Sequence, residues 1–408
     1  MKKTVLRNYA KLIAVTGAGV KKGDTVIIRA QLDQPEFVEM LVKECYLAGA
    51  IDVTVDWSYQ PLTRLHVKHR PLKVMCKVEE WEIAKAKHRA ETLPVMISLT
   101  SADPDGLANI NQEKMSKASI ASYKIMKPII DSMDNKYRWC IAAVPGEKWA
   151  KKVFPGMRTS QAVEKLWEAI LKCARAEEGS DPCENWKRHN ESFVARCEYL
   201  NSLGIKELKY KSENGTDFTV GLIPDGIFMG GGEYSLMGDF YNPNIPTEEI
   251  FTSPMRGKAD GIVYATKPLS YRGELITNFS VRFEDGRAVE VHAEKGEELL
   301  KKMISMDEGA AYLGECALVP FSSPVNETGI LFYNTLFDEN ACCHLALGRG
   351  FTNCIKDYDK YTNEELHGKG INESMIHVDF MIGSADLKIT AVCADGSEKL
   401  IFDGNWLV

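Results

Sequence analysis

The sequence has no long hydrophobic run and no cysteine framework. No stretch approaches the roughly 20 consecutive apolar residues of a membrane-spanning helix, so we expect no membrane partner. The eleven cysteines are scattered from Cys45 to Cys393 without a single CxxC pair. Unpaired cysteines of this kind are typical of a reducing compartment, and we expect a cytoplasmic protein rather than a disulfide-stabilised secreted one.

An excess of positive charge is also missing. The chain has 50 Lys and Arg against 57 Asp and Glu, which gives a formal net charge of −7. An acidic balance disfavours nucleic-acid binding, because that function needs a basic face, and we expect no nucleic-acid partner. Internal repeats and low-complexity tracts are absent as well. What is left is an ordinary globular composition.

The signatures of nucleotide and serine-hydrolase chemistry are missing too. The sequence contains neither a P-loop nor a GxSxG motif. One glycine-rich stretch, GAGVKKG from Gly17 to Gly23, follows an expected helix and precedes an expected strand. A dinucleotide-binding loop needs the reverse order, so that the phosphate meets the N-terminus of the following helix. We therefore expect no organic cofactor, and a dehydrogenase is poorly supported.

The first half of the chain alternates strand-like and helix-like segments. At its start, Leu6, Tyr9 and Ile13 recur at helical spacing between lysines, which predicts an amphipathic helix rather than a signal peptide. Strand–helix alternation of this type predicts a mainly parallel sheet covered by helices. The expected strands are residues 24–30, 51–57, 93–100 and 138–144, and the expected helices are residues 35–48, 112–133 and 160–176.

A polar break at residues 178–185 is the best candidate for a linker, and a helix over residues 186–203 follows it. Beyond this point short strands and turns dominate. Asp285-Gly286 and Asp395-Gly396 each separate two strand-like runs, which predicts two β-hairpins. We therefore predict an α/β domain over residues 1–185 and an α+β domain with mainly antiparallel strands over residues 186–408.

Acidic and imidazole groups cluster in the second domain. His377 and Asp379 are two residues apart in the run IHVDFMIG, and they point to the same face of a strand. Burying a charged group beside an imidazole is costly unless something compensates, and a metal ion does so well. The alternative from the residues alone is a His–Asp hydrogen bond inside the core.

Three more segments carry similar groups. His344 lies in DENACCHLALG, which we interpret as a helix over residues 338–347, with Glu339 near its start. Glu315 stands in the apolar run GECALVP, and Glu249 in NIPTEEIFTSP. Each has a structural alternative: a core histidine for His344, or helix-start acids for Glu339 and Glu249. Together, carboxylates and histidines in this number are what hydrolytic two-metal centres use. The spacing of the nearby cysteines does not fit a thiolate zinc site.

These four segments resemble those of the M29 family of metallo-aminopeptidases, the group of thermophilic aminopeptidase T and staphylococcal aminopeptidase S. The opening YAKLIAVTGAGVKKGDTVIIRA and the mid-chain WCIAAVPGEKWAKKVFPG are also similar to the family, so that the resemblance covers nearly the whole chain. It implies a homodimer with an N-terminal α/β domain and a C-terminal catalytic domain. It also implies two divalent metal ions such as zinc, cobalt or manganese. The implied ligands, mapped by motif, are Glu249, Glu315, Glu339, His344, His377 and Asp379.

The function that the resemblance implies is release of N-terminal amino acids from peptides through a metal-activated water. Our own candidate for the proton shuttle is Glu315, because a bridging carboxylate is well placed for that role. Members of the family carry a tyrosine seven residues after the first metal-binding histidine, and here that position is Phe351. A phenyl ring cannot donate a hydrogen bond to a developing oxyanion. Phe351 therefore keeps an alternative open, that of a metal- or peptide-binding relative with weak or no peptidase activity.

Overall fold

The computed structural model describes residues 1–407, and the chain divides into two compact units. The first contains Met1–Arg188 and Gly232–Pro246, and the second contains His189–Gly231 and Thr247–Val408. The expected α/β organisation of the first half and mainly antiparallel organisation of the second half are confirmed. The domain boundary predicted between residues 185 and 186 stays a prediction.

A five-stranded parallel sheet forms the centre of the first unit, in the order β10-β4-β3-β1-β2. Its apolar strands are covered by the helices that connect them, as expected for a parallel sheet. The four strands predicted in this half are confirmed to within two residues. The strands are β1 (Thr25–Gln31), β2 (Asp52–Ser58), β3 (Val95–Thr100), β4 (Trp139–Ala143) and β10 (Asn244–Ile245).

Of the three helices predicted in this half, the first has its predicted bounds, the second ends two residues early and the third ends three residues early. Pro35 occupies the first turn of α2, and Gly49 ends that helix with φ at 111°, a value that suits glycine. The unit also contains a π-helix at Leu12–Gly17 and the short strands β8 (Glu233–Tyr234) and β9 (Phe240–Tyr241). Its helices are α1 (Lys3–Lys11), α2 (Pro35–Ala48), α3 (Gln60–His69), α4 (Leu72–Met75), α5 (Glu80–Thr92), α6 (Gln112–Asp131), α7 (Glu147–Val153) and α8 (Thr159–Cys173).

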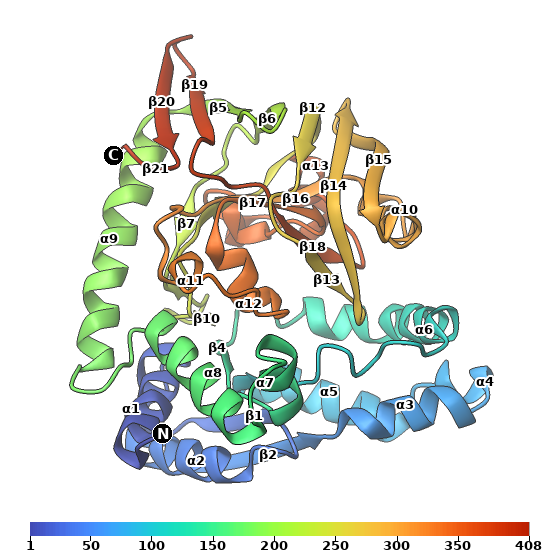
Figure 1. Cartoon of the computed structure of the whole chain (residues 1–408), viewed down its shortest axis with the longest axis vertical. Coiled ribbons are helices and arrows are strands. Elements are labelled where there is room, and N and C mark those ends of the chain that lie inside the picture. The colour runs from blue at the N-terminus through green and yellow to red at the C-terminus, as the bar shows by residue number, and fades with distance from the viewer. Residues whose placement is uncertain (408) are drawn as a thin grey trace. The chain divides into compact units, whose positions relative to one another are not determined.

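The predicted amphipathic helix at the start of the chain is confirmed. Tyr9 and Ile13 are buried, and the Tyr9 hydroxyl donates a hydrogen bond to the carbonyl of Ala143 at 3.1 Å. The Tyr9 ring packs against Phe37 of α2 and Trp167 of α8. In Figure 1, α1 and α2 lie side by side at the blue end of the chain.

The predicted linker at residues 178–185 is shorter than expected. Helix α9 (Pro182–Ser202) begins inside it, because Pro182 occupies its first turn and the Asp181 carboxylate accepts from the amide of Cys183. Sequence composition identified the polar break correctly, but it did not show that the last four residues of the break start a helix. The polar connection therefore ends at Asp181.

Two antiparallel sheets build the second unit. The larger has nine strands, and both predicted Asp-Gly hairpins are confirmed within it. Asp285 and Gly286 adopt φ values of 47° and 78°, the left-handed geometry that favours Asp-Gly in two-residue turns. Its strands are β5 (Ile205–Lys211), β6 (Asp217–Leu222), β12 (Pro254–Tyr264), β13 (Leu269–Tyr271), β14 (Glu274–Glu284), β15 (Arg287–Lys295), β19 (Lys388–Cys393), β20 (Glu398–Asp403) and β21 (Asn405–Trp406).

The smaller sheet has five strands in the order β18-β17-β16-β11-β7. The two sheets share one apolar core, to which Leu208 and Phe218 contribute from the larger sheet and Leu345 and Leu347 from the smaller. The strands of the smaller sheet are β7 (Met229–Gly230), β11 (Ile250–Thr252), β16 (Leu313–Leu318), β17 (His344–Gly348) and β18 (His377–Met381). The helices of this unit are α10 (Glu297–Ile304), α11 (Pro324–Glu327), α12 (Thr335–Asp338) and α13 (Asn363–Gly368).

The helix predicted over residues 338–347 is wrong. Helix α12 ends at Asp338, a 3-10 turn covers Glu339–Ala341, and His344 is the first residue of strand β17. Every residue of the run CHLALG is buried because β17 is a central strand, paired with β16 on one side and β18 on the other. Periodicity alone cannot distinguish a short buried strand from a buried helix.

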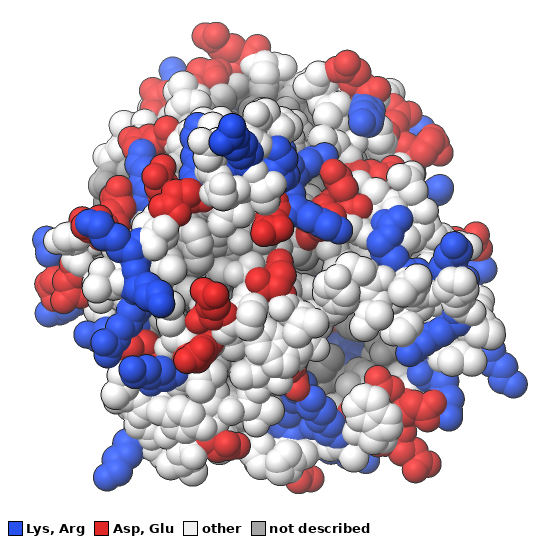
Figure 2. All heavy atoms as spheres, turned by 60° about the horizontal axis from the view of Figure 1, so that its bottom comes forward, with Lys and Arg blue, Asp and Glu red and all other residues white. Residues whose placement is uncertain are grey.

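Among the described residues, no helix has the length and apolar character needed to cross a membrane. On the face drawn in Figure 2, basic and acidic side chains are interspersed rather than segregated. All eleven cysteines are free thiols.

Candidate metal centre

The register of the small sheet aligns two predicted ligands on one rung. Ala346 of β17 pairs with Glu315 of β16 on one side and with Asp379 of β18 on the other. Residues on one rung of a sheet project to the same face. The two carboxylates therefore flank a methyl group, and the small Ala346 side chain leaves room between them.

A β-bulge at Gly314 gives Glu315 this orientation. Leu313 pairs with Leu347 and Glu315 pairs with Ala346, so two steps along β16 match one step along β17. The extra residue rotates Glu315 to the face opposite Leu313, which lies in the apolar core. A Cβ atom on Gly314 would lie 2.2 Å from the carbonyl oxygen of Arg349, so the close approach at the bulge requires glycine.

Both histidines lie on the same face as these carboxylates. His377 is two residues before Asp379 on β18, and His344 is two residues before Ala346 on β17. The Nε2 atom of His377 lies 3.1 Å from Glu315 Oε2 and 3.1 Å from Asp379 Oδ1. The strand alternation thus brings together groups that are more than sixty residues apart in sequence.

Each imidazole is held by a backbone carbonyl at its other nitrogen. His377 Nδ1 lies 2.7 Å from the carbonyl oxygen of Arg349, and His344 Nδ1 lies 3.3 Å from that of Cys342. A carbonyl can only accept, so in the neutral ring Nδ1 carries the hydrogen and Nε2 keeps its lone pair. Second-sphere contacts of this type orient metal-binding histidines. Both Nε2 atoms therefore face the carboxylates as donors of an electron pair.

Glu249 reaches the cluster from the residue before β11. Its Oε2 atom lies 3.2 Å from His344 Nε2, whereas the carboxylate of Glu248 lies 3.8 Å from Nε2 of His189. Consecutive residues in an extended chain point to opposite sides. The structure therefore places Glu249, and not Glu248, with the other predicted ligands. The helix start considered for this segment is absent, because Glu249 leads into a strand.

Glu339 lies beside the cluster, but its carboxylate is not among the most closely spaced ligand atoms. It begins the 3-10 turn that follows α12, and the neighbouring Asn340 holds the local backbone. The Asn340 amide accepts from the N–H of Glu248 at 2.6 Å, donates to the carbonyl of Leu336 at 2.9 Å and approaches Glu339 Oε1 at 3.5 Å. Asn340 was missed by sequence reasoning, and its only signal was an amide side chain directly before a mainly apolar run.

Burial and mutual repulsion shift the pKa values of the clustered acids. Burial raises the pKa of Glu315 to about 7, although the hydrogen bond with His377 opposes this. Burial, together with the charges of Asp379, Glu249 and Glu315, raises the pKa of Glu339 well above its usual range. Burial also opposes ionisation of Asp379, but the adjacent His377 outweighs it and lowers the Asp379 pKa. Four carboxylates at such short range require added positive charge to be ionised together.

The pKa values of both imidazoles are raised by the neighbouring carboxylates. Burial would lower the pKa of His344, but Glu249 and the other carboxylates raise it to about 9. Burial is likewise outweighed at His377, where Asp379 and Glu315 raise the pKa well above the ordinary histidine value. Near neutral pH the pKa shifts therefore favour protonated groups in this cluster, and a bound divalent cation would instead favour ionised carboxylates and neutral imidazoles.

The donor atoms fit metal ions. Two triads bring one ligand atom per residue within 4.8 Å of one another: Glu249, Glu315 and His344 form the first, and Glu315, His377 and Asp379 form the second. His344 Nε2 and Asp379 Oδ1 are buried and make no hydrogen bond with acceptable geometry. A buried imidazole nitrogen and a buried carboxylate oxygen without a hydrogen bond, one in each triad, are groups that a divalent cation satisfies. No cysteine belongs to either triad.

Phe351 stands against the second triad. Its ring centroid lies 4.9 Å from that of His377 and 5.3 Å from that of Phe251. The tyrosines that follow it in sequence pack elsewhere: Tyr358 lies against the small apolar cluster of Ile223 and its neighbours, and Tyr361 lies under Lys369 at 4.4 Å. The position at which the family resemblance implies a tyrosine is thus beside a ligand, and it carries no hydroxyl here.

The comparisons with known proteins agree with this geometry. A family described as thermophilic metalloprotease (M29) matches residues 2–406. The chain belongs to the M29 family of metallopeptidases. It is 39% identical to aminopeptidase AmpS of Bacillus subtilis (strain 168), with 98% of each chain covered. It is 36% identical to aminopeptidase T of Thermus thermophilus, which covers 99% of this chain and 98% of that protein.

The fold of this M29 member is also that of a solved relative. Its structure matches wild-type AmpT from Thermus thermophilus with a TM-score of 0.90 at 34% identity, over 100% of both chains. The prediction of a metallo-aminopeptidase is thereby confirmed at the level of the family. The alternative of a relative without peptidase activity is not the interpretation that these comparisons support.

Proposed function

We propose that this M29 metallopeptidase releases N-terminal amino acids from peptides with two divalent cations held by the cluster on the small sheet. The observation that carries the proposal is the position of Glu315, the one residue common to both triads. A carboxylate offers two oxygens and can serve two ions at once, whereas each imidazole serves one. The first cation would be held by Glu249 and His344, and the second by His377 and Asp379.

Bound divalent cations supply Lewis acidity and make water a better nucleophile at neutral pH. The protein's part is to fix the donor atoms and to manage protons. His344 and His377 present Nε2 in one tautomer because Nδ1 is tied to a backbone carbonyl. The strand pairing around Ala346 holds the carboxylates at a fixed separation, so little reorganisation is needed.

Glu315 is our candidate for the group that moves the proton. Without bound cations, burial raises the pKa of Glu315 to about 7, and bound cations would lower it toward the range of a general base. It would take a proton from the attacking water and give it to the leaving amine. Glu339, whose pKa is raised well above its usual range by burial and by the other carboxylates, would complete the ligand set once the cations favour its ionised form.

The mixed imidazole and carboxylate donors suit zinc, cobalt or manganese. The proposal places the protein in the cytoplasm, in keeping with eleven free cysteines. A homodimer follows from the family resemblance, and light scattering of the purified protein tests it. Peptides with a free N-terminus would be the substrates.

The test combines metal analysis with hydrolysis of leucyl-p-nitroanilide. The wild-type protein should contain two divalent ions per chain and cleave the anilide, and a chelator should remove both properties. His377→Ala should lose metal and activity together. Glu315→Gln should lower kcat by about 10²–10⁴-fold, the usual share of general acid–base catalysis. Glu248→Gln is the matched control and should keep both metals.

Two results would overturn the proposal. One is full anilide hydrolysis by metal-free His377→Ala, which would make the cluster irrelevant to catalysis. The other is binding of a single ion per chain by wild-type protein at saturating metal, which would remove the shared role of Glu315. If Glu315→Gln loses metal, the peptidase assignment stands, but the main role of Glu315 is then metal binding rather than proton transfer.

A further inference from the structure

One peptide bond beside the metal centre is held on both sides by side chains that are distant in sequence. The carbonyl oxygen of Thr247 lies 2.9 Å from Nε2 of His189, and the amide of Glu248 donates to Asn340 Oδ1 at 2.6 Å. This carbonyl and this amide belong to the same peptide bond, and they point in opposite directions because the bond is planar and trans. Two opposed hydrogen bonds therefore fix the peptide that leads to the metal ligand Glu249.

His189 comes from α9, and packing fixes the orientation of its ring. Only 10% of the side chain is exposed, and the ring lies edge-to-face with Phe193, with centroids 4.5 Å apart. A carbonyl oxygen can only accept, so Nε2 of His189 carries the hydrogen that bonds to Thr247. His344 and His377 differ, because there Nδ1 faces a carbonyl and Nε2 faces the carboxylates. His189 is therefore placed as a hydrogen-bond donor and not as a metal ligand.

Gly230 allows the ring that supports His189 to lie against the same backbone. It belongs to β7, where it pairs with Ile250 of β11. A Cβ atom on Gly230 would lie 2.6 Å from the carbonyl oxygen of Glu249 and 3.0 Å from Phe193 Cδ1. Because the side chain is missing, Phe193 and the backbone of the metal ligand approach each other closely.

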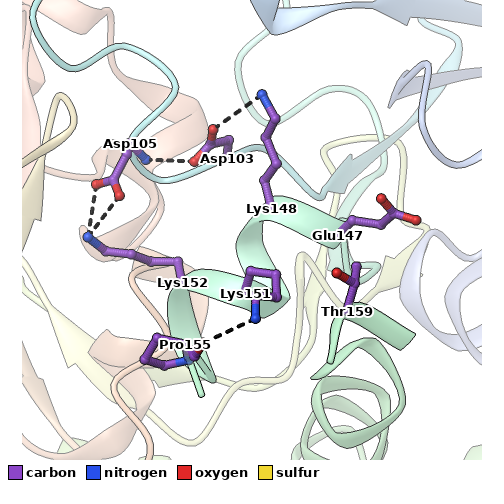
Figure 3. Close-up of a pocket in the computed structure, with 8 residues that line it drawn as sticks. All are labelled: Asp103, Asp105, Glu147, Lys148, Lys151, Lys152, Pro155 and Thr159. Carbon is purple, nitrogen blue, oxygen red and sulfur yellow. Dashed lines mark hydrogen bonds and ion pairs between the residues drawn. The ribbon is translucent and has the colours of Figure 1, made fainter. Parts of the chain in front are cut away.

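Polar side chains around two hollows of the first unit pair with one another instead. A cavity of about 680 Å³ lies beyond β1 and β3, and there the Ser101 hydroxyl donates to Asp33 Oδ1 at 3.0 Å. In the pocket drawn in Figure 3, Lys152 Nζ lies 2.9 Å from Asp105 Oδ2. Each of these contacts joins two side chains. The contact of His189 is of another kind, because its acceptor is a backbone carbonyl two residues before a metal ligand.

We propose that His189 is a positioning residue for Glu249. Together with Asn340, it fixes the plane of the peptide that precedes this metal ligand. That plane sets the direction from which the Glu249 carboxylate approaches His344 Nε2, at 3.2 Å. A metal ligand that is held in place before the cation arrives loses less conformational freedom on binding. The inference rests on the proposed two-cation site, and it makes the cation of Glu249 and His344 depend on a histidine that does not bind it.

The test is a stepwise titration of the metal-free, full-length protein with Co²⁺, followed by visible absorption. Wild-type protein should bind two ions. His189→Phe keeps an aromatic ring beside Phe193 but cannot donate a hydrogen bond. It should weaken the binding of one ion by about 10–100-fold, the usual effect of losing a partner outside the ligand shell. The affinity for the other ion, which His377 and Asp379 hold, should be nearly unchanged.

Two further variants distinguish hydrogen bonding from packing. The amide nitrogen of His189→Gln can occupy the position of the imidazole Nε2, whereas the shorter side chain of His189→Asn does not reach Thr247. His189→Gln should therefore restore the Co²⁺ affinity, and His189→Asn should bind as weakly as His189→Phe. Asn185→Leu is the matched control, because Asn185 donates from the same helix to the carbonyl of Arg175 at 3.0 Å. It should leave both affinities unchanged.

Combining His189→Phe with Asn340→Leu gives a second measurement. Both side chains act on one peptide bond, so their effects should not be additive. The double variant should bind the weakened ion more tightly than the product of the two single fold-changes predicts.

Positioning by His189 is overturned if folded His189→Phe binds both ions as tightly as Asn185→Leu does. It is also overturned if both affinities fall equally, since that reflects a general loosening of the site, or if His189→Gln binds as weakly as His189→Asn. The comparison of His189→Gln with His189→Asn decides the matter alone if His189→Phe does not fold. Wild-type protein that binds fewer than two ions would instead overturn the proposed function, so the two failures are distinguishable.

Discussion

The ring of Phe351 lies 4.9 Å, centroid to centroid, from the imidazole of His377. His377 is held in place by the carbonyl of Arg349 and faces Glu315 and Asp379 through its other nitrogen. A side chain at position 351 is therefore next to the cluster. The replacement of the family tyrosine by phenylalanine removes a hydrogen-bond donor from this place.

Phe351→Tyr should raise kcat for leucyl-p-nitroanilide by about 10–100-fold, because a donor aimed at developing negative charge stabilises the transition state. Metal content should not change. Phe351→Leu is the control, since it alters packing without adding a hydroxyl, and it should not raise kcat. An unchanged kcat in Phe351→Tyr, with metal fully bound, would show that this position does not contact the reacting groups.

Gly314→Ala should destabilise the protein and impair metal binding. Its Cβ atom would lie 2.2 Å from the Arg349 carbonyl, so β16 has to shift or the bulge has to rearrange. We expect a loss of about 3 kcal/mol in the free energy of unfolding, at the upper end for overpacking. Urea denaturation measures it. Gly156→Ala, where no atom lies within 4 Å of the new Cβ, should be nearly neutral. Equal stability of the two variants would contradict the role of the bulge.

Asn340→Leu should weaken metal binding about 10–100-fold, the usual effect of losing an outer-sphere partner. The leucine fills similar space but leaves the N–H of Glu248 without its acceptor, and Glu249 then loses its fixed approach to His344. Asn201→Leu provides the comparison, because the Asn201 amide also accepts one backbone hydrogen bond and donates another, both with Phe228. Competition with a chromogenic chelator measures the metal affinity of both variants, which should be lower in Asn340→Leu. Equal metal affinities would show that Asn340 does not position the ligands.

Asp386 provides a pH-dependent contribution to stability. Hydrogen bonds from Ser384, from the amide of Glu213 and from Ser212 lower its pKa to about 2. A carboxylate with a lowered folded-state pKa stabilises the protein above its unfolded value near 4, and this contribution disappears as the pH falls from about 4 to 2.

Asp386→Asn should therefore lower the free energy of unfolding at pH 7, by no more than about 1 kcal/mol because water screens this partly exposed group. The difference between the free energies of unfolding of the variant and the wild type should become smaller below pH 4. Urea titrations at pH 7, 5, 4 and 3 provide the measurement, with Asp395→Asn of the exposed hairpin turn as a milder comparison. If this difference instead becomes larger toward low pH, ionised Asp386 does not stabilise the folded protein.

Much of the ligand set could be predicted from residue type and local pattern. His377 and Asp379 had to share a face because strand side chains alternate, and the structure places both in β18. The two Asp-Gly turns were predictable for a similarly local reason, because Asp-Gly favours tight turns between strands and glycine readily adopts the left-handed geometry seen at Gly286 and Gly396. The parallel sheet of the first unit followed from its alternating segments.

His344 shows where local pattern is insufficient. Its apolar neighbours are equally compatible with a buried helix, and only pairing with β16 and β18 determines that the segment is a strand. Asn340 shows another limit, because the hydrogen bond that gives it a role spans 92 residues of sequence. The cavity beyond β1 and β3 likewise depends on strand order, which no single segment specifies.

The sequence by itself determined which chemical groups this protein could offer to a cation, namely carboxylates and imidazoles in apolar runs, because burial makes such groups costly without compensation. The tertiary structure decided how they combine. The one-residue bulge at Gly314 turns Glu315 away from the core, and the register around Ala346 sets it opposite Asp379. Register and bulges arise from pairing between distant strands, which local sequence does not encode. Position 351 reflects both levels, since the sequence supplies the phenyl ring and the fold places it beside His377.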